Sequence, residues 1–128
     1  MFTNDPEFRE HGDCRKFVLP TLALPPHSAP LGLAFYTGRQ FPASFHGNLF
    51  VALHGSRRGL PSAGYKIVRV RLDADRVVGI EDFSSRWRVG TRIVGRPVDI
   101  VVSRDGSLYV SDDEAGRIYV VTFGADGR

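Results

Sequence analysis

The sequence predicts an all-β fold, and three observations support the prediction. Apolar residues alternate with polar or small residues in several short runs, no run has a helical period, and the pattern restarts in the second half of the chain. Residues 1–30 contain five prolines and no apolar periodicity, so we expect an irregular segment there. Residues 31–123 are expected to hold the strands, and residues 124–128 form a short tail.

The first unit contains four candidate strands. Residues 31–36 alternate between larger apolar and small residues, and residues 49–53 are wholly apolar, which suits burial on both faces of a sheet. Residues 65–72 alternate and are rich in β-branched side chains. A turn at residues 73–75 precedes residues 77–80, which begin the fourth strand.

The second unit contains three candidate strands, at residues 98–102, 108–111 and 117–123. The first two are joined by Asp105-Gly106, a dipeptide typical of tight hairpin turns. The units match strand by strand: residues 30–35 match 97–102, residues 47–51 match 106–110, and residues 65–70 match 117–121. The chain therefore contains an internal repeat of a short up-and-down sheet.

Repeated four-stranded sheets are typical of a β-propeller, in which each sheet is one blade. We therefore predict a partial propeller of about two blades, one four-stranded and one three-stranded. A ring needs about four to eight blades, so one flank of each blade lacks a neighbour and the last strand has a free edge. We expect such a chain to self-associate or aggregate. The residues expected to pack between blades are Phe50, Val51, Leu53, Ile100, Val102, Tyr109 and Val110.

The composition argues against several classes of function. The formal net charge is only +3, and the arginines are scattered without a nucleic-acid-binding motif. No apolar run is long enough to span a bilayer. The N-terminal residues are polar and lack the apolar core of a secretion signal, so the chain is cytoplasmic if expressed as it stands, or its true N-terminus lies upstream. Cys14 is the single cysteine, which excludes an internal disulfide and a cysteine-rich zinc site.

Several motifs resemble the glucose/sorbosone dehydrogenase family. They are His-Ser-Ala-Pro-Leu-Gly-Leu-Ala-Phe-Tyr-Thr-Gly from His27, Phe-Val-Ala-Leu-His-Gly-Ser from Phe50, and Gly-Tyr-Lys-Ile-Val-Arg-Val from Gly64. Gly-Arg-Pro-Val from Gly95 and Asp-Gly-Ser-Leu-Tyr-Val-Ser-Asp-Asp from Asp105 continue the resemblance. It covers most of residues 17–123, and the two histidine motifs are its most specific parts.

The resemblance implies a six-bladed propeller, usually periplasmic or secreted, that binds pyrroloquinoline quinone (PQQ) and calcium. It implies oxidation of an aldose, or of an aldehyde such as sorbosone, by hydride transfer to the quinone. The matched motifs belong to the last two blades. The family's catalytic histidine and calcium ligands have no counterpart here, so we assign no catalytic residue and no metal ligand.

Three cofactor-binding candidates follow from motif position: His27, His54 and Arg96. PQQ carries three carboxylates, and an arginine pairs with a carboxylate through two parallel hydrogen bonds. The alternatives are a solvated loop histidine for His27, a turn-capping histidine for His54 and a surface arginine for Arg96. Residues 112–114 are three acids that could hold calcium, but their spacing favours a solvated turn.

Two functions remain open. The first is a C-terminal fragment of a PQQ-dependent sugar or aldehyde dehydrogenase that is inactive alone: a gene fragment, a frameshifted product or half of a split enzyme. The second is a non-catalytic binding module that self-associates to complete a ring. The size of the particle in solution would discriminate between them.

Overall fold

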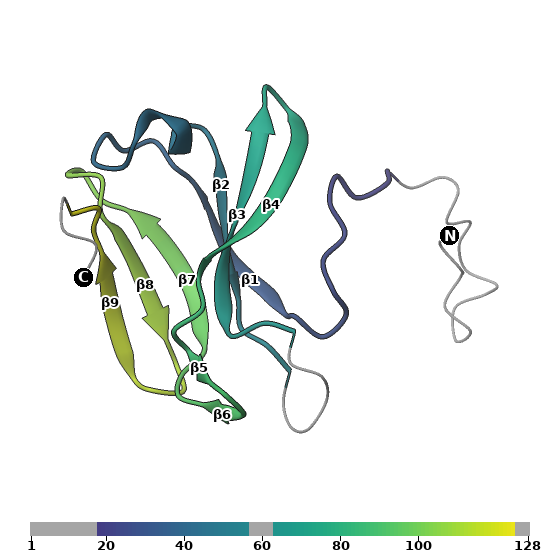
Figure 1. The fold of residues 1–128 in the computed structure, drawn as a ribbon, viewed down its shortest axis with the longest axis vertical. Helices are drawn as coiled ribbons and strands as arrows, with labels where there is room; N and C mark the ends of the chain where they lie inside the picture. Colours follow the sequence, from purple (N-terminus) through teal and green to yellow (C-terminus); the bar gives the residue numbers. More distant parts are fainter. Residues whose placement is uncertain (1–17, 57–62, 125–128) are drawn as a thin grey trace.

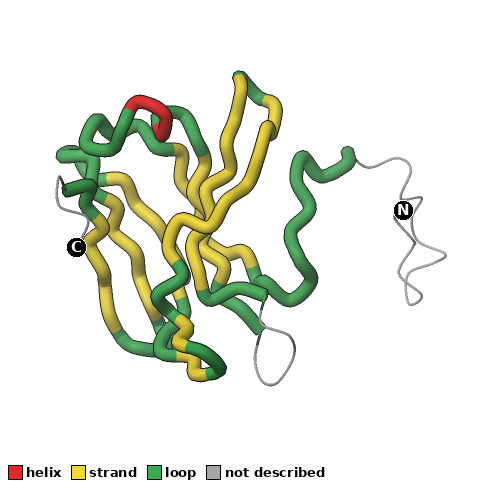
Figure 2. The backbone as a smooth tube through the Cα atoms, viewed as in Figure 1, coloured by secondary structure: helices red, strands yellow, loops and turns green. Residues whose placement is uncertain are grey.

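The computed structural model describes residues 18–56 and 63–124, and these residues fold as antiparallel sheets (Figures 1 and 2). The strands of the four-stranded sheet, in spatial and chain order, are β1 (Pro30–Phe35), β2 (Leu49–Leu53), β3 (Lys66–Asp73) and β4 (Arg76–Ser84). The strands of the three-stranded sheet, again in order, are β7 (Pro97–Val102), β8 (Leu108–Asp112) and β9 (Arg117–Val121). A small ribbon separates them in the chain and pairs β5 (Arg88–Val89) with β6 (Arg92–Ile93).

The predicted all-β fold with one four-stranded and one three-stranded sheet is confirmed. Across the described residues, the helical structure is a single 3-10 turn at Ala43–Phe45. The fourth strand, whose start the sequence places at residues 77–80, runs from Arg76 to Ser84. Its later residues include Glu81 and Asp82, two acidic residues in succession that interrupt the apolar alternation expected of a strand. They are in a strand because their backbone groups pair with β3.

The β5–β6 ribbon was not predicted. Each of its strands is two residues long, with Val89 opposite Arg92, so the segment is too short to show a period of two. Its role is to bring the chain from the outer edge of one sheet to the first strand of the next.

The core lies between the two large sheets. The side chains of β2 and β3 that face the three-stranded sheet pack against those of β7 and β8, and an aromatic group closes one end of the interface. Tyr36 is fully buried there, accepts a hydrogen bond from the backbone of Phe41 and donates one to the carbonyl of Gly106. The buried members are Tyr36, Phe41, Phe50, Ala52, Tyr65, Ile67, Trp87, Ile100, Leu108 and Val110.

The outward faces of the two sheets are apolar. On the four-stranded sheet, Leu22 and Leu24 of the N-terminal segment pack on a second cluster formed by β2 and β3, while Leu33 and Phe35 are 57% and 55% exposed. On the three-stranded sheet the exposed side chains are Val101, Tyr109, Ile118 and Val120. These two surfaces are called the outer faces below.

Strand register relates the inner and outer faces. Leu33 pairs with Val51 in the four-stranded sheet, and Ile100 pairs with Val110 at the equivalent place in the three-stranded sheet. Leu33 and Val51 point outward, whereas Ile100 and Val110 point into the core between the sheets. The outer face of one sheet therefore corresponds, residue by residue, to the inner face of the other.

Candidate functional site

His54 lies where β2 ends, at the same end of the molecule as the β8–β9 turn (Figure 1). Its backbone nitrogen donates to the carbonyl of Ala29 at 3.0 Å, and the nitrogen of Gly55 donates to the carbonyl of Ser28 at 2.9 Å. These two bonds hold the segment before β1 against the end of β2. The His54 side chain is 22% exposed, and its Nε2 lies 3.0 Å from Oδ1 of Asp113. Because a carboxylate only accepts, Nε2 is the donor.

Arg96 immediately precedes β7 and reaches across the junction between the two sheets. Its Nη1 donates to the carbonyls of Gly55 at 3.2 Å and Ser56 at 3.1 Å, and its Nε lies 3.7 Å from Oε2 of Glu114. The guanidinium carbon lies 5.1 Å from the ring centroid of Tyr65, in cation–π range. The side chain is 13% exposed, so this arginine is a largely buried cation between the sheets.

The backbone at this junction is closely packed. A Cβ on Gly64 would lie 2.3 Å from the Cα of Gly55, and the φ of Gly64 is +109°. Only glycine adopts that conformation at such a distance without strain. The Tyr65 ring next to it packs on Gly55 and supports the guanidinium of Arg96.

Asp112 organises the other side of the junction. It is 4% exposed and accepts hydrogen bonds from the backbone nitrogens of Arg96 and Ala115, each at 2.9 Å, and from the hydroxyl of Tyr119 at 3.3 Å. The prediction that residues 112–114 form a solvated turn is therefore wrong for Asp112. A Cβ on Gly95 would lie 2.1 Å from Asp112 Oδ2, which explains why the residue before Arg96 is a glycine.

The other two acids are exposed but paired. The hydrogen bond from His54, with a smaller contribution from the charge of that ring, lowers the pKa of Asp113. Glu114 pairs with Arg96. The three consecutive acids were visible in the sequence, but the partners of each lie on other strands, and alternation carries no information about contacts between sheets.

The structure brings together two of the three predicted site residues. His54 and Arg96 converge on the same turn, because Arg96 bonds the residue that follows His54. His27 lies at this end too, two residues before the Ala29 carbonyl that bonds His54, and its side chain is exposed. Arg57 and Arg58 lie outside the described residues.

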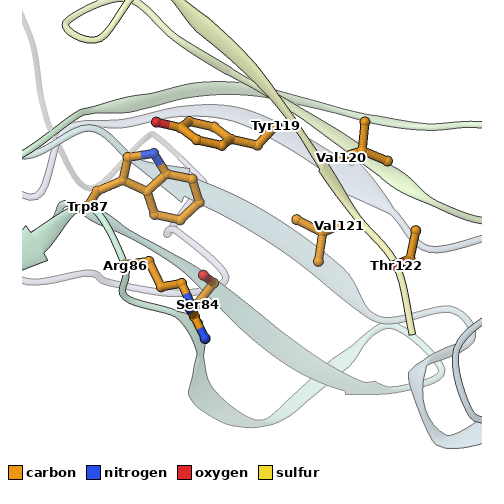
Figure 3. A pocket seen from close by; sticks show the side chains of 7 residues that line it. All are labelled: Ser84, Arg86, Trp87, Tyr119, Val120, Val121 and Thr122. Atoms are coloured by element: carbon orange, nitrogen blue, oxygen red, sulfur yellow. The ribbon is translucent and has the colours of Figure 1, made fainter. Parts of the chain in front are cut away.

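A hollow of about 350 Å³ lies beside β9, on the edge that pairs with no other strand in the described chain (Figure 3). The rings of Trp87 and Tyr119 meet edge to face in it, with centroids 5.6 Å apart. His27, His54 and Arg96 do not contribute to its wall. The lining residues are Ser84, Arg86, Trp87, Tyr119, Val120, Val121 and Thr122.

Neither a metal-binding group nor a membrane-spanning helix is found in residues 18–56 and 63–124. There, no three His, Cys, Asp or Glu side chains come close enough together to hold a metal ion. No helix there is long and apolar enough to cross a bilayer.

The most informative similarities are to PQQ-dependent sugar dehydrogenases. A PQQ-dependent pyranose dehydrogenase of Coprinopsis cinerea is 36% identical over an alignment 124 residues long, and the alignment covers 81% of this chain and 16% of that protein. An uncharacterized protein of Borreliella burgdorferi is 35% identical over 111 residues, covering 84% of this chain and 29% of that protein. This chain therefore spans less than a third of either relative.

Solved structures agree with the sequence similarities. The holo form of the PQQ domain of the Coprinopsis cinerea pyranose dehydrogenase superposes with a TM-score of 0.61 at 34% identity, covering 83% of this chain and 29% of that one. A crystal structure of a glucose dehydrogenase superposes with a TM-score of 0.58 at 26% identity, covering 74% and 24%. The family model described as TrAA12-like matches residues 1–124. The resemblance found in the motifs is thus confirmed, and the chain belongs to the TrAA12-like family.

Proposed function

We propose that this chain is part of a PQQ-dependent dehydrogenase of sugars or related aldehydes, and that its His54–Arg96 junction contributes to binding the carboxylates of PQQ. The observation that carries the proposal is that these two donors, predicted from motif position, converge between the sheets. The named relatives and structural neighbours support the class of reaction. The two large sheets correspond in this proposal to adjacent blades of a six-bladed propeller.

The residues at the junction fit the chemistry of PQQ. PQQ is a tricarboxylate, and the carboxylates of Asp113 and Glu114 already bind His54 and Arg96. The hydroxyls of Ser28 and Ser56 are buried without a hydrogen-bond partner among the described residues, which leaves polar atoms unsatisfied in the two segments that meet here. His27 is exposed at the same end and is the third candidate contact.

In this arrangement PQQ would supply the redox chemistry, and the residues of this chain would bind and orient it. When bound, PQQ supplies a quinone that accepts hydride from the sugar. Arg96 would orient one carboxylate with its planar fork, supported by the Tyr65 ring, and His54 would donate to another. The resemblance places the proton-accepting histidine and the calcium ligands in segments that this sequence does not match. We therefore expect this chain alone to contribute binding without turnover.

Equilibrium binding of PQQ to the purified chain tests the proposal. Arg96→Ala is expected to weaken binding roughly 10- to 100-fold, because a charged hydrogen-bonded pair is lost. Arg104→Ala, a matched change at an exposed arginine of the β7–β8 turn, should leave the affinity unchanged. Arg96→Lys keeps the positive charge but loses the planar fork of the guanidinium. If this variant melts as wild type does, its affinity for PQQ should lie between those of wild type and Arg96→Ala. Absence of PQQ binding, or equal affinity in all variants, would reject the proposal.

The relation between inner and outer faces favours a second candidate function, a binding module that completes a ring by self-association. The outer face of the four-stranded sheet carries Leu33 and Phe35, and that of the three-stranded sheet carries Ile118 and Val120. Because each corresponds to the inner face of the other sheet, a second copy could repeat the existing interface head to tail.

A mixing experiment tests this second candidate. Leu33→Lys places a charge on the outer face of the four-stranded sheet, and Ile118→Lys places one on the outer face of the three-stranded sheet. Head-to-tail association needs both faces, so each variant alone should sediment as a monomer. An equimolar mixture retains one intact face of each kind and should form dimers and nothing larger. A mixture that stays monomeric, or wild type that sediments as a monomer at tens of micromolar, would contradict self-association.

A further inference from the structure

The donors at the junction are less exposed than the carboxylates that bind them. The side chains of His54 and Arg96 are 22% and 13% exposed, whereas those of Asp113 and Glu114 are 64% and 61% exposed. The two donors are therefore held by the sheets, and the two acids approach from the solvent side on the β8–β9 turn. An incoming anion would reach the junction from the same side.

The turn that carries these acids is anchored at its base. Asp112 binds the backbone of Ala115 within the turn and the backbone of Arg96 at the start of β7. This one buried carboxylate thus keeps Asp113 and Glu114 beside their partners. Neither Asp113 nor Glu114 is among the hydrogen-bond partners of Asp112, so loss of either exposed carboxylate leaves this anchor in place.

The charge at the junction opposes binding of a further anion. Asp113 pairs with the ring of His54, Glu114 pairs with the guanidinium of Arg96, and the carboxylate of Asp112 accepts from the backbone nitrogen of Arg96. Among the described residues, a ligand carboxylate therefore meets three carboxylates against one arginine and one histidine, and it competes with Asp113 for the hydrogen bond from His54 and with Glu114 for the charge of Arg96. It gains a site only by replacing one of them.

We propose that Asp113 and Glu114 are specificity-determining residues, which act as internal carboxylate ligands that a polycarboxylate must replace. The inference rests on the proposed function, because it concerns the same donors. Tethered groups compete at an effective concentration in the millimolar range, so a single free carboxylate displaces neither acid at lower concentration. A ligand with two carboxylates spaced for His54 and Arg96 has the same tethering advantage and replaces both acids together.

The test measures equilibrium binding of PQQ and of acetate to wild type and to Asp113→Asn/Glu114→Gln. The matched control is Asp73→Asn/Asp75→Asn, which removes two exposed acids from the β3–β4 turn at the other end of the molecule and makes the same change in net charge. The junction variant is expected to bind PQQ about tenfold more tightly than wild type, since about 1.4 kcal/mol of competing pairing is removed. The control should change affinity less than threefold.

The outcomes separate this inference from the proposed function. Equal PQQ affinity in wild type and the junction variant, or an equal gain in the control, would overturn the inference while leaving the proposed function in place. Failure of both wild type and junction variant to bind PQQ would overturn both. The His54 ring resonances give an independent readout: PQQ should shift them in wild type by removing Asp113, and acetate at the same carboxylate concentration should not.

Discussion

The two large sheets share one register but differ in what surrounds them. Phe50 of β2 and Tyr109 of β8 occupy equivalent positions, opposite Ala34 and Val101. Phe50 is fully buried, whereas Tyr109 is 42% exposed. The same position in a repeated sheet is therefore a core position or a surface position according to whether another sheet covers that face.

The third strands of the two sheets differ in the same way. β3 is paired on both sides, by β2 and β4, whereas β9 is paired in the described chain only by β8 and borders the hollow in Figure 3. Lys66 of β3 and Arg117 of β9 mark equivalent starts of these strands. The comparison shows that the burial of a strand in this chain depends more on the strands and sheets beside it than on its own amino-acid composition.

The largest expected effect contrasts the equivalent aromatic residues. Phe50→Ala should lower the free energy of unfolding by about 3–5 kcal/mol, because it leaves a cavity between the sheets. Tyr109→Ala should lower it by less than about 1 kcal/mol, because that ring lies on an outer face. Urea denaturation measures both. Equal losses would mean that the outer face of the three-stranded sheet is covered in solution.

A smaller effect on the free energy of unfolding is expected where equivalent positions carry an apolar residue in one sheet and an acid in the other. Leu53 of β2 is equivalent to Asp112 of β8, since each pairs with the basic residue that begins the next strand. Asp112→Leu should lower the free energy of unfolding by about 2–3 kcal/mol, because it removes the acceptor of two backbone donors. Asp113→Asn, at an exposed neighbour, serves as the control and should cost far less. If Asp112→Leu left the free energy of unfolding unchanged, the leucine found at this position in the four-stranded sheet could replace the aspartate of the three-stranded sheet.

Amide hydrogen exchange compares the two third strands directly. Amides of β9 that point away from β8 should exchange through local opening, because no strand of the described chain covers them. The equivalent amides of β3 should exchange only in larger opening events, because β4 pairs with them. Equally slow exchange in both strands would reveal a strand from a second copy on the edge of β9.

The smallest expected effect is the pH dependence of the Asp113–His54 contact. The pKa of Asp113 is lowered in the folded chain, so the contact stabilises the fold above the unfolded pKa, about 3.9 for aspartate. This contribution is lost as the pH falls through the lowered pKa. The melting temperatures of wild type and Asp113→Asn should therefore differ at pH 6, approach each other as the pH falls below about 4, and meet only below the lowered pKa. A difference that does not change between these pH values would exclude the contact as its source.

Most of the strands could be predicted because each has a local signal. The alternation of β3 and the apolar run of β2 are such signals, and the Asp105-Gly106 turn appears where predicted, with Asp105 accepting from the nitrogen of Ser107 at 3.0 Å. The β5–β6 ribbon could not be predicted, because two-residue strands have no period. Residues 1–17 lie outside the described residues, so the predicted irregular segment stays a prediction for them.

The candidate site was predictable only in part. His54 and Arg96 were identified from motifs, but Asp112 was assigned to a solvated turn, although it is buried with three donors around it. Its burial depends on Arg96 and Tyr119, which come from a preceding loop and a following strand. Contacts of this kind leave no spacing pattern in the chain.

The sequence by itself determined the all-β class, the repeat, most of the strand positions and the family to which the motifs belong. These properties are local, because alternation and turn residues act within a few positions of the chain. Only the tertiary structure decided which face of each sheet is core, which arginines are buried and which acids pair with His54 and Arg96. Those properties depend on burial and on groups far apart in the chain, and burial is set by the neighbouring sheet rather than by the residue itself.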